Sequence, residues 1–310
     1  MAYIIATTNM KGGVGKTTLT VNLATCLAKN HGKRVLVVDL DTQISATLSM
    51  MSPADFAKLR RDKRTLKQLV QATIKSDGRR LNDIIIDTVY GFVCNIKGLD
   101  LWPGDIELYD EFLVSEVLHE QALYNSDCSF KEVWNRFEKI LIKTMLQPVK
   151  SSYDFILLDC APGYNLLTRS SLMASDFYLL PAKPEPLSLL GVQLLERRIS
   201  QLRDTHEYET PVKLDMLGII FTMSTSLLGG RYYKQVMQRV REDYSENKIF
   251  NTHIPTDINV SKAVDRYMPV VITDPKSSGA QALTTFTKEF LQKIDQATDQ
   301  ERKNTKFRFA

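Results

Sequence analysis

A glycine-rich turn near the amino terminus carries residue types that bind phosphate. It has the sequence Lys11-Gly-Gly-Val-Gly-Lys-Thr-Thr18 and follows the apolar residues 2–8 directly. Glycines let the backbone turn tightly and bring successive N–H groups toward phosphate oxygens, and a helix that starts near Thr17 directs its positive end at the same anion. In such a loop Lys16 contacts the β- and γ-phosphates of a nucleoside triphosphate, Thr17 binds Mg²⁺, and Thr18 contacts the α-phosphate. The candidate nucleotide-binding residues are Gly12, Gly13, Val14, Gly15, Lys16, Thr17 and Thr18.

The turn departs from the strict phosphate-loop pattern at two positions. Met10 stands where the pattern places its first glycine, and a lysine at position 11 is unusual in an ordinary loop of this kind. The alternative is a glycine-rich turn that merely connects a strand to a helix. The two lysines, the threonines and the flanking segments together favour phosphate binding.

Carboxylates end two apolar segments that are typical of buried strands. Asp39 and Asp41 follow the run that starts at Arg34, and Asp159 ends the run that starts at Asp154. Phosphoryl transfer needs a metal held by carboxylates and a positioned water, and strand ends of an open parallel sheet meet at one edge. A lone Asp at such a position is more often a helix cap. Three acids at two strand ends beside a phosphate loop favour a magnesium site.

The surrounding chain alternates strand patterns with helix patterns. Such alternation predicts an α/β fold, a doubly wound, mostly parallel sheet with helices on both faces. Strands are expected at 2–8, 34–39, 98–102, 154–159, 176–181 and 215–222, with a short one near Val270. Helices are expected at 17–29, 113–123, 130–146, 189–204, 232–244 and 281–294.

The domain organisation follows from the absence of an internal repeat or of a linker rich in Pro, Gly or Ser. We expect a single domain, residues 1–296, with extra, mainly helical insertions around 50–97 and 130–147 and a frayed polar tail, 297–310. Residues 58–80 are rich in Lys and Arg.

Bulk composition excludes few functions. The 310 residues are 44% hydrophobic and 25% charged, with a net charge of +4, which permits contact with nucleic acid without demanding it. The four cysteines, at 26, 94, 128 and 160, lack metal-ligand spacing. No apolar run reaches the roughly 18–20 residues that span a bilayer, so we expect no integral membrane segment and a cytoplasmic protein.

The segment Lys11 to Thr18 resembles the deviant Walker A box of the ParA/MinD family, which includes Soj-like partition proteins and the nitrogenase iron protein. The resemblance implies that Lys11 reaches across a dimer interface to the partner's nucleotide. It also implies that Asp159 holds Mg²⁺ through water, and that Asp39 and Asp41 position the attacking water and help bind the metal. Pro162-Gly163 resembles a loop that senses the γ-phosphate.

The resemblance continues downstream and covers about residues 2–47, 98–110 and 153–294. Phe221-Thr-Met-Ser and Ile254-Pro-Thr-Asp resemble loops that flank the adenine, which makes Met223 and Pro255 candidate base contacts. Ordinary packing is the alternative for both.

A partition protein of the ParA type is the function that the resemblance implies. Such a protein dimerises with ATP, binds DNA without sequence preference, and is released when a ParB-like or adaptor protein stimulates slow hydrolysis; it would be cytoplasmic and associated with the nucleoid. Its DNA-binding arginines often follow the Ile-Pro of the adenine loop, whereas this chain has Thr256-Asp-Ile-Asn259. Basic candidates nearby are Arg231, Lys234, Arg239, Lys262 and Arg266, for which a solvated helix face is the alternative. The run at 58–80 favours that alternative.

Other functions on the same scaffold find less support. A MinD-like membrane-surface switch needs a terminal amphipathic helix, whereas the tail has only Phe307 and Phe309 without a sustained apolar stripe. An electron-transfer ATPase needs cluster-binding cysteines, and Cys94 and Cys128 lie outside matching motifs. No substrate signature indicates an amide-forming enzyme.

Overall fold

A computed structural model describes residues 2–75, 78–124, 128–206, 212–224 and 230–308. Seven strands form one sheet in the order β3-β2-β4-β1-β5-β6-β7, and every neighbouring pair is parallel. The strands are β1 (Tyr3–Thr7), β2 (Val35–Leu40), β3 (Leu99–Trp102), β4 (Phe155–Cys160), β5 (Phe177–Ala182), β6 (Asp215–Ser224) and β7 (Ile249–Pro255). The predicted doubly wound α/β fold is confirmed.

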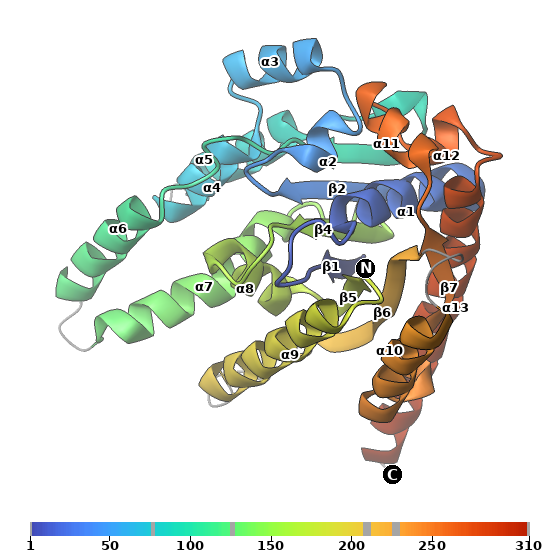
Figure 1. The fold of residues 1–310 in the computed structure, drawn as a ribbon. Helices are drawn as coiled ribbons and strands as arrows, with labels where there is room; N and C mark the ends of the chain where they lie inside the picture. Colours follow the sequence, from blue (N-terminus) through green and yellow to red (C-terminus); the bar gives the residue numbers. More distant parts are fainter. Residues whose placement is uncertain (1, 76–77, 125–127, 207–211, 225–229, 309–310) are drawn as a thin grey trace.

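Helices cover both faces of the sheet (Figure 1). One face packs against α4 (Leu66–Ile74), α5 (Gly78–Thr88), α6 (Glu111–Tyr124), α7 (Phe130–Leu146), α8 (Leu166–Ala174), α9 (Pro186–His206) and α10 (Gly230–Asp243). The other face packs against α1 (Lys16–His31), α2 (Ser45–Leu48), α3 (Pro53–Arg61), α11 (Ile258–Asp265), α12 (Val270–Thr273) and α13 (Ser278–Arg308). Apolar residues on both sides of the strands therefore belong to two separate cores.

The register of the central strands brings three chain segments together at the carboxyl end of the sheet. Thr7 and Asp39 are both paired with Asp159. The phosphate loop leaves β1 at this end, so the turn and the two strand-end acids meet there as the sequence predicts.

The two outermost strands of the sheet, β3 and β7, both have partners for their outer backbone groups. Tyr90 and Leu101 exchange backbone hydrogen bonds beside β3. At the other edge Glu289 of α13 accepts hydrogen bonds from the backbone N–H groups of Asn251 and Thr252 in β7. These contacts occupy backbone groups that would otherwise pair with another chain.

Several segments differ from the sequence-based expectation, among them the helices α8 and α11, which were not expected. The strand expected near Val270 is wrong: this apolar run forms the short helix α12 between Pro269 and Asp274. Strand β7 was not expected, because Asn251 and Thr252 interrupt its apolar pattern at the sheet edge. Helix α13 continues to Arg308 where we expect a frayed tail from residue 297.

Candidate functional site

The phosphate loop has the backbone shape that its glycines allow. Gly13 and Gly15 have φ angles of 68° and 82°, in the left-handed region where a side chain would be strained. Gly15 is the N-cap of α1, so the loop leads directly into the positive end of that helix. Between the two glycines, Val14 is fully buried and its carbonyl accepts a 2.7 Å hydrogen bond from the Thr222 hydroxyl. The loop is thus anchored to β6 while its glycines remain at the sheet edge.

Lys16 is a buried cation in the first turn of α1. Its side chain is only 5% exposed, and Nζ donates to the carbonyl of Lys11 at 3.3 Å. Burial lowers the pKa of Lys16, and the neighbouring Asp159 partly offsets this effect. A phosphate anion in the loop would supply the charge partner that this ammonium group needs.

Thr17 and Asp159 form the centre of the predicted metal site. The Thr17 hydroxyl donates to Asp159 at 2.7 Å, and the Thr20 hydroxyl donates to the other carboxylate oxygen at 3.2 Å. Burial raises the pKa of Asp159, and the nearby Asp39 carboxylate raises it further. A hydroxyl and a carboxylate at a phosphate loop are the donor types that Mg²⁺ uses together with phosphate oxygens and water, so these residues fit the ion.

Asp39 is fully buried and held by protein donors. Its Oδ2 accepts from the backbone N–H of Thr47 at 2.8 Å and from the Thr47 hydroxyl at 2.6 Å, and its Oδ1 accepts from the N–H of Asp41 at 3.3 Å. Burial raises the pKa of Asp39 despite these hydrogen bonds. Since both oxygens accept hydrogen bonds from the protein, the geometry favours a role for Asp39 in holding the Asp41 turn over the direct contact with the metal that the resemblance implies.

Asp41 follows β2 in the turn that leads to α2. It is 7% exposed, and its Oδ1 accepts from the N–H of Gln43 at 3.0 Å. Asp41 lies close enough to Lys16 for its carboxylate, like that of Asp159, to offset part of the lowering of the Lys16 pKa by burial. Of the two acids at the end of β2, Asp41 is less buried than Asp39, and it is near the lysine of the phosphate loop.

Lys11 differs from Lys16 in being at the surface. Its side chain is 36% exposed, and Nζ lies 3.3 Å from a carboxylate oxygen of Glu185, immediately before α9. Such an exposed pair is weak, about 0–1 kcal/mol. The lysine can therefore leave Glu185 for a stronger anion.

Asn9 organises the region around Lys11, a role that the sequence did not suggest. Its side chain donates to the carbonyl of Pro181 at 2.8 Å and accepts from the N–H of Lys11 at 3.0 Å. Its backbone carbonyl accepts from Gly163, in the loop after β4. Asn9 thus joins the phosphate loop to the loop containing Pro162, which lies beside Gly12.

Met223 and Pro255, the two candidate adenine contacts, line one small cavity. Its volume is about 180 Å³, and Gly15, Thr18 and Leu283 also line it. Asp257 borders the cavity, but its carboxylate is occupied by the N–H groups of Asn259 and Gly279 and by the Ser278 hydroxyl. The cavity adjoins the phosphate loop, where the base of a bound nucleotide would lie.

The candidate DNA residues are only partly described. Lys262 and Arg266 are exposed on and just after α11, where Arg266 pairs with Asp274 at 3.2 Å. The side chains of Arg231 and Lys234 lie outside the described residues. In the 58–80 run, Arg60 and Lys67 pair with carboxylates and Arg64 donates to the carbonyl of Asp87, so those three cations already have protein partners.

Comparison with known proteins identifies the scaffold. A family model described as an AAA domain matches residues 2–213. The sporulation initiation inhibitor protein Soj of Bacillus subtilis is 32% identical over 291 residues, which cover 93% of this chain and 98% of Soj. The chain belongs to the ParA/MinD family of P-loop ATPases.

A further relative and a solved structure cover the chain to a similar extent. The chromosome partitioning protein ParA of Myxococcus xanthus is 27% identical over 290 residues, covering 94% of this chain and 88% of ParA. The solved structure of apo McdA from Cyanothece covers 94% of this chain and all of its own, with a TM-score of 0.67 at 19% identity. That likeness shows that the two share a fold. None of the helices in the described ranges combines the length and the apolar character that crossing a bilayer requires.

Proposed function

We propose that this ParA/MinD family member binds MgATP, dimerises around it, hydrolyses it slowly and uses the cycle to position a plasmid, a chromosome or another cargo. The observation that carries the proposal is the 2.7 Å contact between Thr17 and Asp159 beneath a loop that contains the buried Lys16. We further propose that residues 1–296 form one ATPase domain.

The roles of the site residues follow from their positions. Backbone N–H groups from Gly12 to Thr18 and the ammonium of Lys16 would bind the phosphates, and Thr17 and Asp159 would hold Mg²⁺. The ion would neutralise the developing charge on the phosphate oxygens. The side chains of Met223 and Pro255 would contact the adenine.

Hydrolysis requires a water molecule in line with the bond between the β- and γ-phosphates. Asp41 is the carboxylate that would orient that water, because both oxygens of the fully buried Asp39 accept hydrogen bonds from the protein, whereas Asp41 is 7% exposed and its Oδ1 accepts from Gln43. The water oxygen bonds to the γ-phosphorus as the bridging oxygen leaves with ADP. Lys16 and Lys11 stabilise the negative charge of the transferred group.

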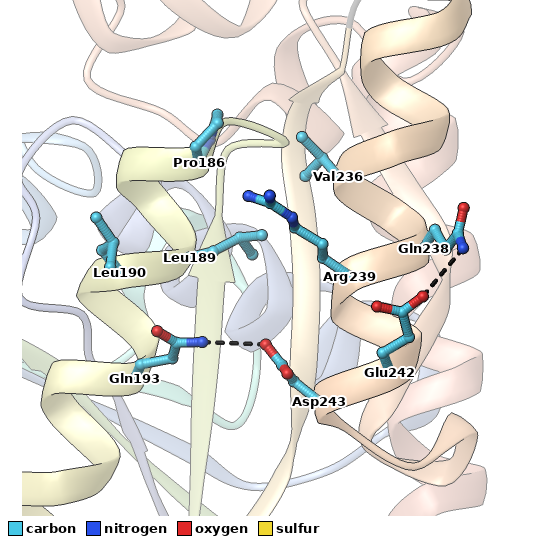
Figure 2. A pocket seen from close by; sticks show the side chains of 9 residues that line it. All are labelled: Pro186, Leu189, Leu190, Gln193, Val236, Gln238, Arg239, Glu242 and Asp243. Atoms are coloured by element: carbon cyan, nitrogen blue, oxygen red, sulfur yellow. Dashed lines mark hydrogen bonds between the residues drawn. The ribbon is translucent and has the colours of Figure 1, made fainter.

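An exposed apolar row beside the phosphate loop supports a homodimer. Leu187, Leu190 and Leu194 of α9 are 68%, 51% and 50% exposed, at spacings that place them on one side of the helix. Gly191, in the same helix, packs against Asn9 and Lys11. Leu190 is one of the residues that line a groove of about 550 Å³ between α9 and α10, and Figure 2 shows its side chain on the side of α9 that faces away from α10. Burying the row against a second copy would bring the partner's Lys11 toward this site.

DNA binding and a partner protein complete the proposed cycle. Chromosome partitioning appears in the name of the Myxococcus xanthus relative, and the chain has a net charge of +4. We propose nonspecific DNA contact through basic residues such as Lys262 and Arg266, a ParB-like or adaptor protein as activator, and a cytoplasmic location at the nucleoid. Contact of this kind is electrostatic and weakens as salt rises.

One set of measurements tests this proposal. Phosphate release and sedimentation are followed without nucleotide, with ADP and with MgATP, and each sample is also assayed on nonspecific duplex over a salt series. We expect hydrolysis, a dimer and salt-sensitive DNA binding in the samples with MgATP, and a monomer without DNA binding in the samples with ADP or without nucleotide. A protein that stays monomeric and releases no phosphate would contradict the proposal, and ATP-dependent sedimentation with liposomes in place of DNA binding would favour a MinD-like switch.

A further inference from the structure

A chain of polar contacts connects helix α3 and the start of α4 to the carboxylate of Asp39. We call it the Asp105 network, and it comprises Arg60, Thr65, Asp105, Gly104 and Thr47. Its members come from α3, the start of α4, the loop after β3, and α2. In Figure 1, α2 lies between α3 and β2.

The outer half of the network surrounds a buried carboxylate. The Asp105 side chain is 1% exposed, and its Oδ2 accepts from the Thr65 hydroxyl at 2.7 Å. Its Oδ1 accepts from the N–H of Glu107 at 2.9 Å and lies 3.4 Å from Nε of Arg60. Arg60 is the cation paired with this carboxylate, and a buried carboxylate that loses its cation is strongly disfavoured.

The inner half of the network reaches the site through Gly104. The N–H of Gly104 donates to the Thr47 hydroxyl at 2.9 Å, and that hydroxyl donates to Asp39 at 2.6 Å. A Cβ atom at position 104 would lie 2.9 Å from the backbone carbonyl of Asp39, so only glycine lets the two backbones approach this closely. The position of Gly104 therefore fixes the direction in which Thr47 holds Asp39.

The consequence for hydrolysis passes through Asp41. Asp39 accepts from the N–H of Asp41, so a displaced Asp39 carboxylate changes the turn that carries Asp41. The phosphate loop shares no hydrogen bond with the network among the described residues: Lys16 donates to the loop carbonyl of Lys11, and the hydroxyls of Thr17 and Thr20 donate to Asp159 of β4 and to their own helix. Loosening the network should thus affect the water-positioning acids more than nucleotide binding.

We propose that α3 and the start of α4 act as a brace for hydrolysis, in which Arg60 and Asp105 are positioning residues that hold the Asp39–Asp41 turn through Gly104 and Thr47. This inference rests on the proposed ATPase function. It gives the basic residue Arg60 a role in hydrolysis through its contact with Asp105, without contact to the nucleotide or to DNA.

The test compares Arg60→Gln with Arg61→Gln, the same change one residue along. Arg61 is 75% exposed and pairs only with its neighbour Asp62 among the described residues. We expect Arg60→Gln to lower kcat roughly tenfold while KM for MgATP changes less than about threefold. Arg61→Gln should keep wild-type values, and thermal unfolding should confirm that both variants are folded.

A double-mutant cycle tests whether the contacts form one path. Thr47→Val removes the hydroxyl between Gly104 and Asp39 and should also lower kcat. Because both changes act on the same carboxylate, Arg60→Gln with Thr47→Val should be less damaging than the product of the two single effects.

Three results would overturn the inference. They are an Arg60→Gln variant with the kcat of Arg61→Gln, an equal loss of nucleotide affinity and kcat, and fully multiplicative effects in the double variant. A folded wild-type protein without any ATP hydrolysis would instead overturn the proposed function, and the brace with it.

Discussion

The site contains one buried cation, Lys16, and two buried carboxylates, Asp39 and Asp159. Lys16 is buried and its pKa is lowered, while burial raises the pKa of Asp39 and of Asp159. Each shift reflects the loss of water around a charged group. A phosphate on one side and a divalent cation on the other would restore favourable charge partners, so the site is arranged to gain free energy when MgATP binds.

Removal of the Lys16 charge should weaken nucleotide binding. A hydrogen bond to a charged group contributes about 1.5–3 kcal/mol, which corresponds to roughly tenfold to a hundredfold in affinity. We expect Lys16→Ala to raise the dissociation constant for MgATP, measured by calorimetry, at least about tenfold. Lys29→Ala, at the exposed end of the same helix, is the control. Unchanged affinity in Lys16→Ala would contradict the assignment.

Asp41 should separate nucleotide binding from hydrolysis. A positioned group that orients or deprotonates the attacking water contributes about 10²–10⁴-fold to the rate. Asp41→Ala is expected to bind MgATP, to sediment as a dimer and to release phosphate at least about a hundredfold more slowly. Asp62→Ala, on the surface after α3, serves as control. A variant that is monomeric with MgATP would count against this role.

At the level of elements, sequence patterns identify six of the seven strands and predict correctly that the glycine-rich turn meets the acids that end β2 and β4. Continuous apolar runs such as Val35–Leu40 and Phe155–Cys160 are easy to recognise because helices bury both faces. The edge strand β7 was missed because its polar residues are satisfied by Glu289, a partner 37 residues away from Thr252. The contacts of Thr47, Asn9 and Thr222 depend likewise on distant residues, which a local pattern does not reveal.

The exposed face of α9 gives a prediction for dimerisation. Leu190→Glu places a charge in the apolar row beside Lys11. Because desolvating an unpaired carboxylate disfavours the interface, the dissociation constant of the ATP-dependent dimer should rise about tenfold or more. Nucleotide binding by the monomer should persist. Leu123→Glu, on the distant helix α6 at a residue that is 73% exposed, is the matched control. Equal dimer affinity in both variants would exclude this face.

Gly104 gives a prediction for stability. Ala at this position forces the loop away from the Asp39 carbonyl, and overpacking of this kind costs about 1–3 kcal/mol. Gly104→Ala should lower the free energy of unfolding by that amount in urea. Gly91→Ala is the comparison, because its Cβ would lie 3.4 Å from Asp100. Equal stability of the two variants would show that the loop yields without strain.

For the whole molecule, the site, the α9 face and the basic residues of α11 belong to one sheet edge and its neighbours. The cavity near Thr18 is lined by residues of both β7 and α11, so a nucleotide there would contact the element that carries Lys262. A nucleotide in this cavity would therefore change the surroundings of the charges on α11.

Salt dependence of DNA binding distinguishes a phosphate contact from a solvated helix face. Each phosphate contact contributes about 0.9 to the slope of log affinity against log salt. Lys262→Glu should weaken ATP-dependent binding to any duplex sequence and lower the slope by about 1 per subunit. Lys58→Glu, at an exposed position of α3, makes the same charge change away from α11. If both variants lose affinity equally, the effect is one of net charge. If neither does, Lys262 belongs to a solvated face, and the DNA surface must be sought elsewhere on the dimer.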